Sequence, residues 1–421
     1  MVHRPIAVLL AAATVLAPAA ARADDRDFAL RSADGAFEFR LKGLLQVDAR
    51  FFADDEQAFN DTFLLRRLEP SFEFTLGKRA CVKLQPQFAG DAVTTSDVFG
   101  ELRFAPAATL RFGKFKTPLA LEYLQASSAL AFVERGLPTE VGAGRDFGIQ
   151  LHGALPGGAS YAIAWLNGAP DGRDAANTDT DNHKEVAARV FFEPFKGGDG
   201  PLRGLGVGLA ATRGTKLGAI AASASATTAT FNNTLPRYRS PAQNTIFTYL
   251  GSTTAPTAAN TVIAAGTHAR LSPQLTFYRG PFGLLAEQLS SEQEVSINGV
   301  AQSFEHTAWQ AAASWVITGE AASYKGIKPA APYASGAPGW GAFEVALRHG
   351  VLDVDDAVFP TYADPAASVS EATTTGVAVH WHLDFNVRVS LDYEATGFEG
   401  GAAGGDRRDE KALLARLQVA F

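Results

Sequence analysis

The chain has 421 residues, of which 37 are basic and 44 acidic, and its formal net charge at pH 7 is −7. This balance excludes a dominant basic surface of the kind that binds nucleic acid. A single cysteine, Cys81, excludes a disulfide framework. No uncharged apolar run of about 18 residues follows Ala23, so no helix is expected to span a bilayer. The chain is therefore either soluble or crosses a membrane with strands.

The first 23 residues have the composition of an export signal. His3 and Arg4 precede an uncharged, mostly apolar stretch, and Ala21-Arg22-Ala23 matches an A-x-A cleavage site. A transmembrane helix is the weaker interpretation, because the stretch is rich in alanine and a cleavage pattern closes it. We therefore expect residues 1–23 to be a signal peptide and residues 24–421 to form one exported domain.

Apolar and polar residues alternate with a period of two over stretches longer than most globular strands. From Phe37 to Phe51, one set of alternate positions reads Phe, Phe, Leu, Gly, Leu, Val, Ala, Phe, and the other reads Glu, Arg, Lys, Leu, Gln, Asp, Arg. Successive side chains of a strand point to opposite faces, so one face is apolar and the other charged. The last such segment ends on Phe421 and resembles the terminal strand of bacterial outer-membrane barrels. About sixteen strands are predicted, at residues 36–51, 61–76, 80–90, 97–105, 108–114, 145–154, 158–167, 184–195, 202–213, 265–279, 281–296, 302–318, 341–354, 371–384, 386–397 and 411–421.

The predicted connections alternate between short and long. Gly77 to Ala80 is a tight turn, whereas residues 116–144, 167–183 and 214–264 are long. Short turns at one end and long loops at the other are typical of outer-membrane barrels. The connection 319–340 departs from this rule, because it is long where a short turn is due.

A soluble β-sandwich would also alternate, with its apolar side chains in a packed core. However, no domain linker interrupts the strand-like runs, and a closed sheet of sixteen strands leaves a water-filled channel. The sequence therefore predicts an all-β fold, a transmembrane antiparallel β-barrel of about 16 strands whose charged face lines the lumen.

Two segments carry a resemblance to a known family. The sequence FGKFKTPLALE at residues 112–122 resembles the G-[RQK]-F-K-x-P-[FL]-[SGA]-L-E segment of the phosphate-selective porin O and P family, and AFVERGLP at residues 131–138 resembles its F-x-E-R-x-L-P segment. Further similarity covers nearly the whole chain after residue 23. The resemblance implies a trimeric, sixteen-stranded porin in the outer membrane of a Gram-negative bacterium, whose third loop, about Phe115 to Arg145, folds inward.

The same resemblance implies passive diffusion of small hydrophilic solutes, with a preference for anions that comes from Arg and Lys in the lumen. Two positions depart from the phosphate-binding members. Tyr123 stands where those carry a lysine after Leu-Glu, and Gly100 replaces an acidic residue before the glutamate of the fourth strand. The expected solutes are therefore small anions, and phosphate itself stays an open question.

Basic residues on the charged face are the candidates for lining the pore, because such a charge on the lipid face costs about 2–4 kcal/mol at mid-depth. The alternative role is pairing with acidic residues of the wall, and Glu134 and Arg135 could likewise pair with each other to anchor the loop. The strand candidates are Arg40, Lys42, Arg50, Arg67, Arg103, Arg111, Arg189, Arg348, Arg388 and Arg416. The constriction candidates flank or lie in the third loop and are Lys114, Lys116, Arg135 and Arg145.

No catalytic constellation is recognisable. There is no G-x-S-x-G motif, and strand alternation explains why His380 and His382 share a face, so neither enzymatic activity nor a metal or cofactor is expected. The expected partners are outer-membrane lipid, small anionic solutes and two further copies in a homotrimer. The alternative function is a non-conducting structural or adhesive barrel whose 214–264 loop binds partners.

Overall fold

The computed structural model describes residues 28–421 except residues 54–58, 180, 221–234, 253–255 and 335–337. The expected signal peptide, residues 1–23, lies outside the described residues. The strands are β1 (Phe28–Arg31), β2 (Phe37–Phe52), β3 (Thr62–Leu76), β4 (Ala80–Gln87), β5 (Thr94–Ala105), β6 (Ala108–Lys116), β7 (Arg145–Leu155), β8 (Ala159–Leu166), β9 (Glu185–Phe192), β10 (Leu205–Leu217), β11 (Arg237–Arg239), β12 (Thr245–Thr248), β13 (Ile263–Arg279), β14 (Phe282–Ile297), β15 (Val300–Val316), β16 (Ala342–Asp353), β17 (Val369–His382), β18 (Val387–Ala402), β19 (Gly405–Asp406) and β20 (Glu410–Ala420). The helical turns are α1 (Leu121–Leu124), η2 (Ser127–Ala129), α2 (Pro138–Val141), η3 (Pro156–Gly158) and η4 (Asp356–Val358). Among the described residues, every helix is too short or too polar to cross a bilayer.

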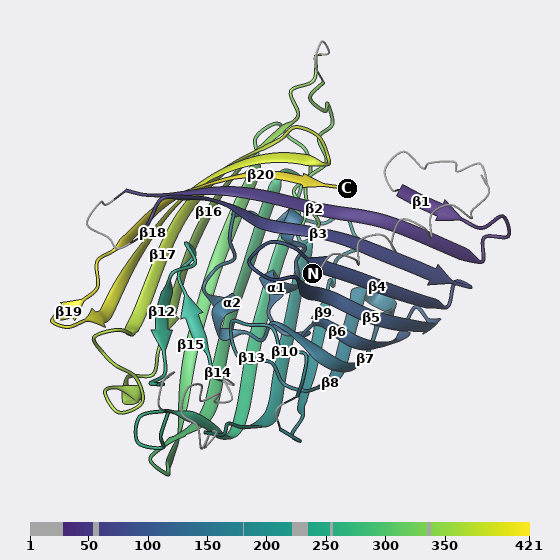
Figure 1. Ribbon diagram of the computed structural model, residues 1–421. Helices are drawn as coiled ribbons and strands as arrows, with labels where there is room; N and C mark the ends of the chain where they lie inside the picture. Colours follow the sequence, from purple (N-terminus) through teal and green to yellow (C-terminus); the bar gives the residue numbers. More distant parts are fainter. Residues whose placement is uncertain (1–27, 54–58, 180, 221–234, 253–255, 335–337) are drawn as a thin grey trace, which may run out of the picture.

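The wall closes on itself. Each wall strand pairs antiparallel with the next along the chain, and β20 pairs back to β2 in a register that runs from Leu44 opposite Ala420 to Phe52 opposite Ala412. The wall consists of β2 to β10, β13 to β18 and β20, while β1 and β19 extend its edges (Figure 1). The prediction of an all-β, sixteen-stranded antiparallel barrel is confirmed, and each predicted strand corresponds to one strand of this wall.

The two faces of the wall differ as the alternation predicts. In β2, Asp48 and Arg50 are buried on the inner face, whereas Val47 and Phe51 are exposed on the outer face. In β16, the outward Leu347 is 64% exposed and its neighbour Arg348 only 3%. Apolar side chains therefore form the lipid face, and charged side chains point into the barrel.

The connections also follow the prediction. The turns between β3 and β4 and between β13 and β14 are tight, and the loops at the opposite end are mostly long. An exception at the loop end is the hairpin of β14 and β15, where Asn298 and Gly299 have φ angles of 51° and 78°, as a two-residue turn requires. The departure predicted at 319–340 is confirmed, because residues 317–341 connect β15 to β16 at the turn end. This segment lies at the top of Figure 1, on the side opposite β12 and β19.

Two segments fold into the barrel and fill one side of it. The inward loop, residues 117–144 between β6 and β7, carries α1 and α2, as predicted for the third loop. Residues 235–252 carry the β11–β12 hairpin. Val141 of the loop and Phe247 of the hairpin belong to one buried apolar cluster with Leu289 of β14. The interior next to β13–β17 is therefore packed with protein.

Candidate functional site

Glu134 of the inward loop is surrounded by arginines of the wall. Arg66 of β3 donates to both of its carboxylate oxygens, at 2.5 and 3.0 Å, and Arg50 and Arg416 donate to one of them at 3.2 and 3.1 Å. Burial alone would raise the pKa of Glu134, but the charges of Arg66 and Arg416 outweigh it and hold the pKa well below its ordinary value. Glu134 thus anchors the loop as an ionised carboxylate, and its partners are these wall arginines and not Arg135.

A second anchor uses two carboxylates that share one amide. Glu287 of β14 accepts hydrogen bonds from the main-chain N–H groups of Leu121 and Glu122, at 2.6 and 3.1 Å. Glu122 in turn accepts from the N–H of Gly136 at 2.8 Å and from Nε2 of Gln310 at 2.8 Å, and the same Nε2 lies 3.1 Å from Glu287. These bonds tie both arms of the inward loop to β14 and β15.

The middle of the loop is held from the other side of the barrel. His380 of β17, Arg388 of β18 and Gln418 of β20 donate to main-chain carbonyls within residues 128–131, at 2.8, 2.8 and 3.0 Å. From the turn end, the hydroxyl of Tyr324 donates to the carbonyl of Leu121 at 2.6 Å. The loop therefore spans the lumen and is bonded to several strands at once.

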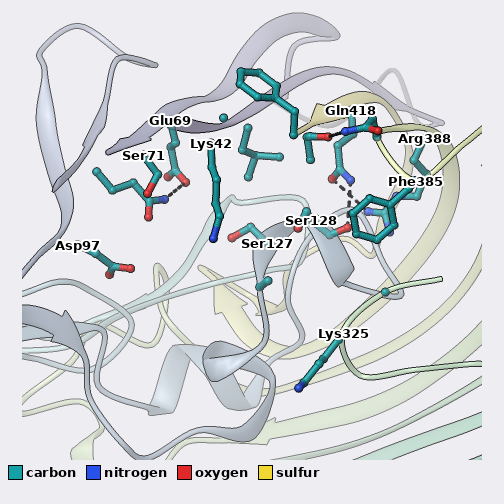
Figure 2. Close-up of a pocket in the computed structure, with 18 of the residues that line it drawn as sticks. Lys42, Glu69, Ser71, Asp97, Ser127, Ser128, Lys325, Phe385, Arg388 and Gln418 are labelled. Carbon is teal, nitrogen blue, oxygen red and sulfur yellow. Dashed lines mark hydrogen bonds between the residues drawn. The ribbon is translucent and has the colours of Figure 1, made fainter. Parts of the chain in front are cut away.

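Three cavities next to the loop are lined by residues of the wall, in particular of β2 to β8, together with residues of the loop itself and of other connections. The loop-side cavity has a volume of about 660 Å³, the turn-side cavity about 620 Å³ and a neighbouring side cavity about 570 Å³. Glu69, Ser127 and Arg145 line both the loop-side and the turn-side cavity, so the passage narrows between them. Figure 2 shows the turn-side cavity, into which Lys42 extends from the wall toward Ser127, while Lys325 enters from the segment between β15 and β16.

The basic residues singled out in the sequence divide by their position around these cavities. The loop-side cavity is lined by Arg67, Lys114, Arg135 and Arg145, the turn-side cavity by Lys42, Lys116, Arg145 and Arg388, and the side cavity by Arg111, Lys116 and Arg189. Arg40 and Arg103 line a basin of about 280 Å³ at the turn end. Arg50, Arg348 and Arg416 are buried under the inward loop and line none of these cavities.

Comparison with known proteins identifies the family. The profile of the family described as phosphate-selective porin O and P matches residues 39–421. The chain belongs to this family. It is an outer-membrane porin of the Gram-negative type, a channel protein and not an enzyme.

The fold of the porin is also found in solved structures. The outer membrane channel DcaP of Acinetobacter baumannii has a TM-score of 0.56 at 11% identity, with 93% of this chain and 99% of DcaP covered. The anion-selective porin from Comamonas acidovorans has a TM-score of 0.56 at 11% identity, with 91% and 100% covered, and OmpT of Vibrio cholerae 0.56 at 9%, with 94% and 100% covered. No curated protein sequence matches this chain. At such identities the likeness shows the fold alone.

Some of the porin's basic residues are neutralised by carboxylates. The guanidinium of Arg145 lies 2.7 Å from Asp97, and that of Arg111 lies 2.7 Å from Glu101. The alternative role of the basic residues, pairing with acidic residues of the wall, therefore applies to some of the candidates. The other carboxylate pairs are Arg40 with Glu38, Lys42 with Glu73, Arg50 with Glu134 and Asp48, Arg103 with Glu101, Arg348 with Glu394 and Glu122, and Arg416 with Asp48 and Glu134.

Among the basic residues singled out in the sequence, five that line the loop-side or the turn-side cavity have no carboxylate within 4 Å among the residues that the structure describes, and Arg189 of the side cavity has none either. They donate to neutral acceptors instead, or to none. Arg67 donates to Oε1 of Gln46 at 2.6 Å, and Lys116 to the carbonyls of Tyr123 and Gln125 at 2.7 and 2.8 Å. The five are Arg67, Lys114, Lys116, Arg135 and Arg388, and each lines a cavity beside the narrowing.

Sequence reasoning missed Arg66, the main partner of Glu134. Strict alternation allows only one of Arg66 and Arg67 to point inward. The register between β2 and β3 shifts between Gln46 and Val47, where Arg67 pairs with Gln46 and Leu65 with Val47, so Arg66 is an extra residue. This bulge lets both arginines reach the lumen, and no signal in the sequence marks it.

Proposed function

We propose that this porin conducts small hydrophilic solutes by passive diffusion and prefers anions to cations. The observation that carries the proposal is the set of five cations without carboxylate partners beside the narrowing. Fixed cationic donors attract an anion, replace part of its hydration shell and pass it from one to the next. The porin's overall negative charge does not oppose this, because the field in a narrow passage is set by the nearest charges.

Two acidic residues near the narrowing, Asp97 and Glu69, are bonded to other side chains of the protein. Asp97 lies 2.8 Å from the ammonium of Lys83 and 2.7 Å from the guanidinium of Arg145. Glu69 accepts hydrogen bonds from the neutral side chains of Gln85 and Gln87, at 2.8 and 2.9 Å. Asp97 is therefore paired with two cations, whereas Glu69 has no cationic partner within 4 Å among the described residues. A permeating cation would meet this one carboxylate, whereas an anion would meet five cations without a carboxylate partner.

The proposal extends to small anions in general and not to phosphate in particular. By the family resemblance, Tyr123 stands where phosphate-binding members carry a lysine and Gly100 stands where they carry an acidic residue. We also propose that the porin works as a homotrimer, as its family resemblance implies; OmpT of Vibrio cholerae, which shares the fold, has been solved in a trimer form.

The test is the zero-current potential of the purified porin in a planar bilayer under a tenfold KCl gradient. A perfectly selective pore would reach about 59 mV, and we expect a smaller value with the sign of chloride selectivity. The triple variant with Arg67→Gln, Lys114→Gln and Arg135→Gln should move this potential toward zero. Lys196→Gln is the matched control, because it removes one positive charge from a 65% exposed side chain in a turn outside the lumen.

Each possible result decides between functions. A potential with the sign of potassium selectivity would refute the anion preference. A purified barrel that carries no current would refute the channel function and would favour the structural or adhesive alternative.

A further inference from the structure

Three cations gather around a single aromatic ring in the inward loop. The ring centroid of Tyr123 lies 5.2 Å from the guanidinium carbon of Arg135, 5.4 Å from Nζ of Lys116 and 6.0 Å from the guanidinium carbon of Arg145. These distances are in the range of cation–π attraction. Tyr123 is therefore a point at which three cations of the inward loop and its flanking strands meet.

The ring is fixed in place by its hydroxyl group. Tyr123 donates this hydroxyl to Oδ1 of Asp174 at 2.8 Å and accepts from Nη1 of Arg145 at 3.3 Å. Arg135 is equally fixed, since its Nε and Nη2 donate to the carbonyls of Glu122 and Gln125, at 3.2 and 3.1 Å. The stack of Tyr123 and Arg135 is therefore preorganised, and both residues line the loop-side cavity.

Two basic side chains that line this cavity carry a donor that the protein does not use. Nζ of Lys114 has no hydrogen-bond partner among the described residues, although the residue is only 5% exposed, and Nη1 of Arg135 likewise has none. Such cationic donors bind carboxylates. The cavity therefore offers a free ammonium group for a carboxylate and, in the same lining, a guanidinium group over an aromatic ring.

We propose that the loop-side cavity contains a binding site for aromatic carboxylates, in which Lys114 binds the carboxylate and the ligand's ring stacks on the guanidinium of Arg135 above Tyr123. Guanidinium groups stack on aromatic faces, whereas a compact ammonium does so less well. The cavity volume of about 660 Å³ is in the range of sites for small organic molecules, about 300–1,000 Å³. The inference rests on the proposed anion channel and narrows its substrate class.

The experiment compares two probes of equal charge and similar size. Benzoate and cyclohexanecarboxylate are added in turn to porin that carries a chloride current in a planar bilayer, and the half-blocking concentration of each is measured. The aromatic ring should make benzoate the stronger blocker by about two- to fivefold. Inorganic phosphate, measured in the same way, should block more weakly than benzoate.

Two variants of Tyr123 and one matched control locate the effect. Tyr123→Leu should reduce the ratio of the two half-blocking concentrations to about one, whereas Tyr123→Phe should keep a ratio above one, because the ring remains although its bond to Asp174 is lost. Phe385→Leu is the control, since it removes another lumen-facing ring that has a cation, Lys328, at 5.2 Å. The ratio should not change in this control.

Equal block by benzoate and cyclohexanecarboxylate in the unmodified porin would overturn the inference. A ratio that survives in Tyr123→Leu would overturn it as well. Both outcomes would leave the anion channel intact, because its own test is the sign of the zero-current potential without any blocker.

Discussion

Replacing Glu134 by glutamine should weaken the attachment of the inward loop to the wall. The effect should be larger than that of any other substitution that removes one charged side chain from the loop. Arg416 would keep its two contacts of 2.7 Å with Asp48, and Arg50 would keep Asp48 at 3.8 Å. Arg66 has no second carboxylate within 4 Å among the described residues, so it would lose its ionic partner entirely. The loss should therefore fall mainly on the contact between Glu134 and Arg66.

The structure also indicates the magnitude. Removing one partner of a buried ion pair costs about 3–5 kcal/mol, because a charge is left without compensation. The side chain of Arg66 keeps 25% of its surface exposed, while that of Glu134 keeps 3%. Water can therefore solvate part of the stranded guanidinium, and we expect a loss of about 3 kcal/mol, at the lower end of the range.

The assay is urea unfolding of the porin folded into lipid vesicles, with Glu134→Gln, Arg66→Gln and the double variant measured side by side. The double variant should lose less free energy of unfolding than the sum of the two single variants, with a coupling of about 1–3 kcal/mol. In single-channel recordings, Glu134→Gln should also show a noisier open current, because the loop moves more. Strictly additive losses together with unchanged current noise would refute the anchoring role of Glu134.

Three further predictions address the pore, the lipid face and the loop. Burial raises the pKa of Glu140 in the loop-side cavity to about 6, although the charge of Arg239 acts in the opposite direction. The negative charge of Glu140 is therefore lost as the pH falls from 7 to 5, and the chloride preference measured by the zero-current potential should rise over this interval. Glu140→Gln should reduce this rise. Leu347→Arg places a charge on the lipid face and should cost about 2–4 kcal/mol of unfolding free energy in vesicles, whereas Leu347→Phe should be nearly neutral. Gly136→Ala would place a Cβ against the flexible end of Gln310, so the Gln310 side chain should turn away and lose its bonds to Glu122 and Glu287; single-channel recordings should then show the same noisier open current as Gln310→Ala alone.

The barrel could be predicted from the sequence because alternate residues of each strand face lipid on the outside and water on the inside. The inward Asp48 and Arg50 and the outward Val47 and Phe51 of β2 follow from period-two alternation alone. The inward loop, by contrast, was predicted only through the family resemblance. Its local sequence has no property that distinguishes an inward from an outward loop.

The bonding within the lumen could not be predicted, because it joins residues that are far apart in the sequence. Glu134 contacts Arg66 and Arg416, which are 68 and 282 positions away. A bulge in β3 turns Arg66 inward, against the alternation that identified Arg67. Alternation correctly places Arg348 on the inner face of the wall. It does not predict that the inward loop covers this residue, as the bond from Arg348 to the carbonyl of Glu134 shows.

The proposed anion preference depends most on Arg135 lying in the ion path and setting the charge there. The direct measurement uses Arg135→Cys in a Cys81→Ser background, with the zero-current potential recorded before and after modification by thiol reagents of opposite charge. A positively charged reagent should restore chloride preference and a negatively charged one should reduce it further. If the thiol reacts with both reagents and the potential stays the same, Arg135 does not set the charge in the ion path, which would contradict the proposed anion preference.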